Sequence, residues 1–166
     1  FALVSWARDV YKRQVQLVCP PNLMFMYMPS HLNHMIFELM KNSLRAVVER
    51  YGVEREDHYP PIKVIVVEGK EDITIKISDE GGGIPRSEVP LVWTYTYTTA
   101  RPDDLDPDFQ TSDFLAPMAG FGYGLPLARL YARYFGGDLK LISMEGYGTD
   151  VYLHLNRLSS SSEPLP

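Results

Sequence analysis

The chain has 166 residues, of which 45% are hydrophobic and 22% are charged, and its formal net charge at pH 7 is −5. This composition is too apolar for a disordered chain and predicts one domain with a single core. The acidic balance argues against nucleic acid as a partner. The lone Cys19 excludes an internal disulfide, and no apolar run approaches the roughly 18 residues of a membrane span.

The first part of the chain changes character at Val15. Residues 1–14 show no lasting period and lack the apolar region and cleavage site of a secretory signal, so we interpret them as a non-native segment or the remnant of something upstream. After them, residues 15–20 and 23–27 are short β-prone runs bounded by proline. They predict two early strands.

A long amphipathic helix is predicted from Ser30, its expected N-cap, to residue 51, with Gly52 as its stop. The side opposite its apolar residues brings together, within roughly 80° of the helical projection, an acid, an amide and two basic groups: His34, Glu38, Asn42 and Arg45. One interpretation is the solvated face of a core helix. The other is a site in which the acid and the amide, one turn apart, share a ligand.

Two further strands are predicted at 62–68 and 72–78, and their close spacing indicates a hairpin. The second run alternates strictly, which is typical of an antiparallel sheet that is buried on one side. Asp79 then precedes three glycines, in a stretch that can bend sharply or approach a ligand closely. Its carboxylate could cap this turn or accept a hydrogen bond from an exocyclic amine such as that of adenine.

Residues 86–93 predict one or two helical turns, and residues 94–119, which have no steady period, predict a lid. The glycine loop at 120–126 leads into a helix that is expected to end at Gly136. Free N–H groups and the helix dipole at such an N-terminus form an anion site. Phosphate is the expected ligand of this loop.

The last predicted elements are strands at 139–144 and 150–155, joined as a second hairpin. Thr149 lies in their connection, either as a simple hairpin residue or as a hydroxyl group in a pocket. Residues 159–166 are rich in Ser and Pro and predict a flexible tail.

Four motifs follow one another in the chain: Glu38-x-x-x-Asn42, Asp79-x-Gly-Gly-Gly, Gly120-x-Gly-x-Gly and Gly148-Thr-Asp. Together they resemble the four boxes of the GHKL ATPase superfamily, which includes type II topoisomerases, large heat-shock chaperones, mismatch-repair ATPases and histidine kinases. Within it, GFGYGLP, RLYARYFGGDL and SMEGYGTD are similar to the mitochondrial protein kinases, above all the pyruvate dehydrogenase kinases. The resemblance covers residues 15–166. It implies a Bergerat-type ATP-binding fold over residues 15–158, an α+β two-layer sandwich with a mixed, mostly antiparallel sheet covered by helices on one face.

The resemblance also implies roles for single residues. Glu38 would orient or deprotonate the attacking hydroxyl with His34 as its support, and Asn42 would bind Mg²⁺. Asp79 would read the adenine amine, with Thr149 assisting. The other expected ATP contacts are Lys41 and Arg45 near the phosphates, Gly81, Gly83, Gly120, Phe121, Gly122, Tyr123, Gly124 and Leu125 in the glycine loops, and Thr98 and Thr99 at the start of the lid.

The implied activity is transfer of the γ-phosphoryl group of ATP to a serine of the E1α subunit of the pyruvate dehydrogenase complex, which inactivates that complex in the mitochondrial matrix. Family members have an N-terminal helical bundle that contributes to docking of the substrate and of the E2 lipoyl domain. This chain starts after that bundle, so we expect the catalytic half alone, with a homodimer through the sheet left open.

Three alternatives stay open at this point. A branched-chain ketoacid dehydrogenase kinase shares all four boxes, although residues 95–119 are more similar to the pyruvate enzymes. A histidine kinase would need a phosphoacceptor histidine on a dimerising helix, whereas His31 and His34 belong to the ATP-site helix. A module that binds nucleotide as a switch would not need the acid of the first box.

Overall fold

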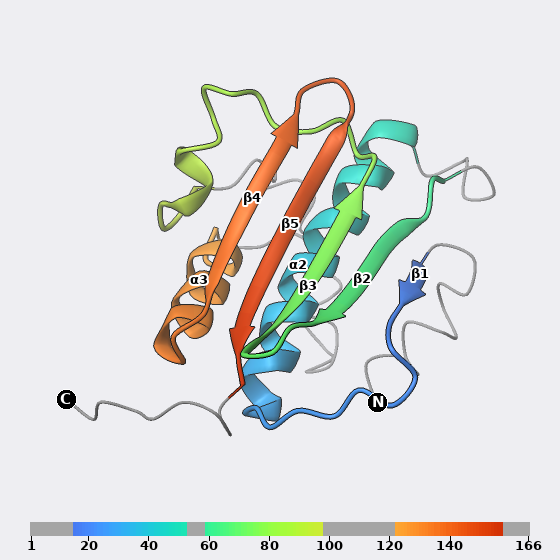
Figure 1. The fold of residues 1–166 in the computed structure, drawn as a ribbon. Helices are drawn as coiled ribbons and strands as arrows, with labels where there is room; N and C mark the ends of the chain where they lie inside the picture. Colours follow the sequence, from blue (N-terminus) through green and yellow to red (C-terminus); the bar gives the residue numbers. More distant parts are fainter. Residues whose placement is uncertain (1–14, 53–58, 98–121, 158–166) are drawn as a thin grey trace, which may run out of the picture.

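The computed structural model describes residues 15–52, 59–97 and 122–157. The elements, in chain order, are β1 (Val15–Val18), α2 (Pro29–Tyr51), β2 (Ile62–Glu68), β3 (Asp72–Asp79), the 3-10 helix η2 (Leu91–Trp93), α3 (Gly124–Tyr134), β4 (Asp138–Met144) and β5 (Gly148–Asn156). Figure 1 shows two layers, with α2 and α3 on the same face of one sheet.

The sheet has five strands in the order β1-β2-β3-β5-β4. The strand β1 runs parallel to β2, and the pairs β2–β3, β3–β5 and β4–β5 are antiparallel. Both predicted hairpins are therefore present. The expected two-layer α+β architecture, with a mixed and mostly antiparallel sheet covered on one face, is confirmed.

The core lies between the sheet and the two helices. Along β3 every second residue is buried, and the buried side chains are Ile73, Ile75, Ile77 and finally Asp79. They meet Met35 and Leu39 from α2, which are 0% and 1% exposed. Alternation in the strand and the helical period in α2 thus place their apolar residues in the same interior, as the sequence predicts.

The second early strand was predicted wrongly. Residues 23–27 belong to no strand, yet their side chains alternate between the core and solvent. The side chains that pack against the core are Leu23, Phe25 and Tyr27. An extended segment can bury alternate residues against a helix without pairing with a strand, so the β-prone composition alone did not decide the structure.

The start of α2 also differs from the prediction. The helix begins at Pro29 with Met28 at the N-cap position, and no side chain caps it. Ser30 therefore lies inside the first turn. Proline fits this place because its fixed φ is compatible with a helix and its missing N–H would have no intrahelical partner there.

Residues 86–90 form turns, and residues 91–93 form the single helical turn of the 3-10 helix η2, which falls within the predicted helical stretch. Within the described ranges, none of the helices combines the length and the apolar character needed to cross a membrane. The predictions for residues 1–14, for 98–119 of the lid and for the tail at 159–166 fall on residues that the structure does not describe.

Candidate active site

A cavity of about 400 Å³ lies between α2, the loop after β3 and the beginning of α3. These segments are far apart in the sequence, and α2 and α3 pack against each other on the sheet (Figure 1). The expected site residues that line the cavity are Glu38, Asn42, Arg45, Gly81, Gly83, Gly122, Gly124 and Leu125. The fold therefore collects three of the four sequence motifs around one cavity.

The polar face of α2 supplies one wall. Lys41 Nζ lies 2.9 Å from both carboxylate oxygens of Glu38, and the two side chains are only 11% and 13% exposed. Asn42 is exposed and lines the cavity. Arg45 also lines it, but its Nε donates to Glu49 Oε1 at 2.6 Å. Glu49 was not predicted as a cavity residue, although the i, i+4 spacing of opposite charges would have indicated its pairing with Arg45.

His34 was expected to support Glu38. No hydrogen bond joins the two side chains, both of which lie in the described part of α2, and His34 Nε2 is buried without a hydrogen-bond partner there. Its ring instead meets Tyr131 of α3 edge to face, with ring centroids 5.3 Å apart. The structure therefore gives His34 a packing contact between α2 and α3, and the role toward Glu38 stays a prediction.

Asp79 ends β3 and is 7% exposed. Its Oδ2 accepts a hydrogen bond from Ser43 Oγ at 3.0 Å, and its Oδ1 accepts from the backbone N–H of Gly81 at 2.9 Å and of Thr149 at 3.3 Å. Burial raises the pKa of Asp79, while these three hydrogen bonds oppose the rise. A carboxylate has about four acceptor positions, so Asp79 keeps capacity for one more donor.

The register of the sheet explains this arrangement. Asp79 pairs with Thr149 across β3 and β5, so Thr149 lies within β5 and not in the hairpin connection. The buried Ser43 was missed by sequence reasoning, because a serine beside Asn42 on an amphipathic helix gives no sign of the strand end that it meets. The Asp79 side chain is not part of the cavity lining, but Gly81, which it anchors, is.

The glycines after Asp79 are required by close packing. A Cβ on Gly81 would collide with Ala46 of α2, and one on Gly83 would collide with the backbone of Met144. Gly83 also has φ +71°, a conformation that favours glycine. These contacts bring the loop against both layers, which leaves its backbone as a wall of the cavity.

The N-terminus of α3 forms the adjoining wall. The helix begins at Gly124, and a Cβ on that residue would overlap Glu38 Oε2. Gly122, with φ +76°, lies against the backbone of Thr96 and Tyr97. The free N–H groups at this helix end are therefore placed beside the acid of α2 and can bind an anion there. Tyr123 is 43% exposed.

Four predicted contacts lie outside the described residues: Thr98, Thr99, Gly120 and Phe121. Their roles stay predictions.

The sequence matches the family model for the histidine kinase-, DNA gyrase B- and HSP90-like ATPases over residues 28–159. The chain belongs to this ATPase family. Its match spans α2, the Asp79 loop, the beginning of α3 and the last hairpin, which are the segments that build the cavity and anchor its walls. The Bergerat-type fold expected from the four motifs is thereby confirmed.

The chain is also similar to several mitochondrial kinases. The chain is 65% identical over 154 residues to the mitochondrial pyruvate dehydrogenase (acetyl-transferring) kinase of Schizosaccharomyces pombe, covering 92% of this chain and 36% of that protein. It is 58% identical over 154 residues to the kinase of the same name from Arabidopsis thaliana, covering 92% of this chain and 42% of the relative. For isozyme 3 of Homo sapiens the identity is 56% over 141 residues, covering 84% and 33%. The ATPase domain thus spans about a third to two-fifths of these relatives.

Proposed function

We propose that the chain is the ATP-binding, catalytic part of a mitochondrial serine kinase that phosphorylates and inactivates the E1α subunit of the pyruvate dehydrogenase complex. The observation that carries this proposal is the position of Glu38 against Gly124. The carboxylate of Glu38 lies beside the N-terminus of α3, where two walls of the cavity meet. A proton acceptor and a phosphate site are therefore adjacent. The identities with the named kinases support the choice of substrate.

The described residues fit ATP and Mg²⁺. The cavity of about 400 Å³ is within the range of small-molecule sites. Asp79 and Thr149 lie behind the Gly81 wall and not in the lining, and the acceptor position that Asp79 retains is the one we assign to the adenine amine, with Thr149 assisting. Among the described residues no group of three or more His, Cys, Asp or Glu could hold a metal ion. A Mg²⁺ ion at Asn42 would therefore take its remaining ligands from phosphate oxygens and water, which is how Mg²⁺ is usually held.

In the proposed reaction Glu38 takes the proton of the serine hydroxyl. The serine oxygen forms a bond to the γ-phosphorus, the bond from that phosphorus to the bridging oxygen breaks, and ADP leaves with the electron pair. Bound Mg²⁺ would offset negative charge on the phosphates. Positioning dominates such a transfer because its transition state is loose. Lys41 and Arg45, which pair with Glu38 and Glu49, would act on the phosphates only by exchanging these partners for them, and His34 holds α2 against α3.

The proposal also includes the proteins with which the kinase would assemble. E1α is the substrate, and docking of the E2 lipoyl domain is assigned to sequence outside this chain, as the family resemblance implies. A homodimer through the open face of the sheet and a location in the mitochondrial matrix belong to the same proposal. The names of the relatives support the mitochondrial part.

The test is incubation of the protein with γ-labelled ATP and with purified E1α of the pyruvate or of the branched-chain complex. The protein is tested both by itself and joined to the N-terminal part of the S. pombe relative. Acid-stable label on a serine of pyruvate dehydrogenase E1α is expected. Label on branched-chain E1α alone would indicate the branched-chain enzyme instead. Acid-labile label on the protein itself would indicate a histidine kinase, and ATP binding without transfer in either form would indicate a nucleotide switch.

A further inference from the structure

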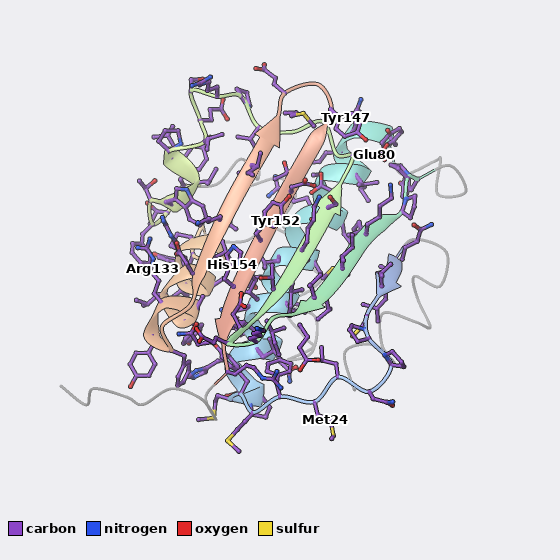
Figure 2. All side chains as sticks on the ribbon, in the orientation of Figure 1. Met24, Glu80, Arg133, Tyr147, Tyr152 and His154 are labelled. Carbon is purple, nitrogen blue, oxygen red and sulfur yellow. The ribbon has the colours of Figure 1, made fainter. Side chains whose placement is uncertain are left out.

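Arg50, in the last turn of α2, bridges two loops that are distant in the sequence. Its Nη1 donates to the carbonyl oxygens of Glu80 at 2.9 Å and Tyr147 at 2.5 Å, and its Nη2 donates to the carbonyl oxygen of Gly146 at 3.0 Å. Glu80 follows β3, whereas Gly146 and Tyr147 form the turn between β4 and β5. Figure 2 shows Glu80 and Tyr147 at the same end of the sheet.

The two loops are also joined directly through their backbones. The N–H of Gly82 donates to the carbonyl oxygen of Tyr147 at 3.0 Å, and the N–H of Gly146 donates to the carbonyl oxygen of Gly82 at 2.7 Å. The carbonyl of Tyr147 therefore accepts from both Gly82 and Arg50. Arg50 completes a small bridge that has Gly82 at its centre.

This bridge lies directly behind the wall of the cavity. Gly81 and Gly83, on either side of Gly82, both line the cavity, and the N–H of Gly81 anchors Asp79. Gly82 has φ +97°, and its open side faces the Arg50 side chain. A shift of Gly82 would therefore move the backbone that borders the cavity together with the carboxylate expected to read adenine.

We propose that Arg50 is a positioning residue for nucleotide binding: it holds the Gly81–Gly83 wall in place by fastening it to the β4–β5 turn and to the end of α2. This inference rests on the proposed nucleotide site, but the fastening itself can be measured without a nucleotide. Within the described ranges, Arg50 makes no hydrogen bond to a residue expected to contact the phosphates, so its effect passes through the loop.

The planar guanidinium is suited to this task. It directs several N–H groups in a fixed fork, whereas the ammonium of lysine is a single point charge on a flexible stem. Arg50 is exposed, so the three carbonyl groups would regain hydrogen bonds to water if it were removed. Its loss should therefore free the loop and lower the global stability by no more than it lowers the free energy of opening the loop.

The test compares the unaltered protein with Arg50→Met, Arg50→Lys and the control Arg133→Met. Arg133 is also in the last turn of a helix, but it pairs with Asp138 and lies away from Glu80 and Tyr147 in Figure 2. The readouts are amide hydrogen exchange at Gly82 and Gly146, the dissociation constant for Mg·ATP from calorimetry, and Tm.

For Arg50→Met we expect exchange at both amides and the dissociation constant to rise about tenfold each, the scale of a lost hydrogen bond to a charged group. Arg50→Lys should give intermediate changes, and Arg133→Met none. Unchanged exchange or unchanged affinity in Arg50→Met would overturn the proposal, and so would exchange in the core strands that rises more than at Gly82 and Gly146. If Arg50→Met does not fold, Arg50→Lys decides by the same criteria. Failure of the unaltered protein to bind Mg·ATP would refute the nucleotide site, while the exchange data would still show whether Arg50 holds the loop in place.

Discussion

Lys41 Nζ lies 2.9 Å from each carboxylate oxygen of Glu38. Exposed ion pairs usually contribute little, since water competes for both charges, but these two side chains are only 11% and 13% exposed. The lysine therefore compensates a charge that would otherwise be costly at the cavity wall. It also fixes the position of the acid that we propose as the general base.

This pairing predicts a measurable coupling between the two residues. In a double-mutant cycle of Lys41→Met and Glu38→Gln, we expect a coupling of about 1–2 kcal/mol in the free energy of unfolding, between the values of surface and buried pairs. Urea denaturation of the four proteins measures it. The control cycle uses Arg133→Met and Asp138→Asn, a pair whose side chains are 53% and 31% exposed. A coupling no larger than that of the control would contradict the structural importance of the contact.

Two substitutions at Asp79 distinguish its part in folding from its proposed part in adenine recognition. Asp79→Asn can keep all three contacts, because its Oδ1 can accept from Gly81 and Thr149 while its Nδ2 donates to Ser43. Asp79→Ala leaves those groups without their acceptor and should cost about 1–3 kcal/mol of stability. Both variants lose the carboxylate acceptor, so calorimetry should show ATP binding abolished in Asp79→Ala and strongly weakened in Asp79→Asn. Affinity at the level of the unaltered protein would refute the adenine role.

The pH dependence of stability provides a second check on this residue. Burial raises the pKa of Asp79 above its ordinary value of 3.8. The stabilising contribution of the protonated side chain is therefore fully present below pH 3.8 and is lost as the pH rises through the higher pKa of the folded state. Asp79→Asn has no such titration. The stability of the unaltered protein relative to Asp79→Asn should therefore fall as the pH rises from about 4 toward neutrality. A relative stability that instead rises over this range would show that hydrogen bonding outweighs burial.

Gly124 joins the phosphate-binding helix to the proposed base. Gly124→Ala should leave folding intact, because alanine favours a helix and the atom it would meet is the end of the flexible Glu38 side chain. Displacement of that carboxylate should lower phosphoryl transfer about tenfold. Gly69→Ala is a matched control, since its Cβ would also meet a carboxylate, that of Asp72, at the β2–β3 turn. Equal activities of the two variants would argue against the proposed position of Glu38.

Local patterns in the sequence predicted most of the fold. The alternation in β3 and the helical period in α2 identified their buried faces, because each face meets a continuous core. The β-prone composition misled at residues 23–27, where core contacts come from an unpaired extended segment. Strand pairing depends on a partner elsewhere in the chain, which a short window does not contain.

The spacing of the first motif predicted that Glu38 and Asn42 share one site, and both line the cavity. The residues that fasten the motifs were missed. Ser43 meets Asp79 across 36 positions, and Arg50 meets Tyr147 across 97. Neither residue type nor local spacing indicates such contacts, because they arise only when the helix packs on the sheet.

On one face of α2 we assign proton transfer to Glu38 and nucleotide binding, through Mg²⁺, to Asn42. The most direct test of this assignment measures both on Glu38→Gln, with calorimetry for Mg·ATP and γ-labelled ATP for transfer to E1α. We predict an affinity close to that of the unaltered protein and a transfer rate lower by at least about 100-fold, as expected when a general base is lost. Unchanged transfer would contradict the assignment of Glu38 as the base.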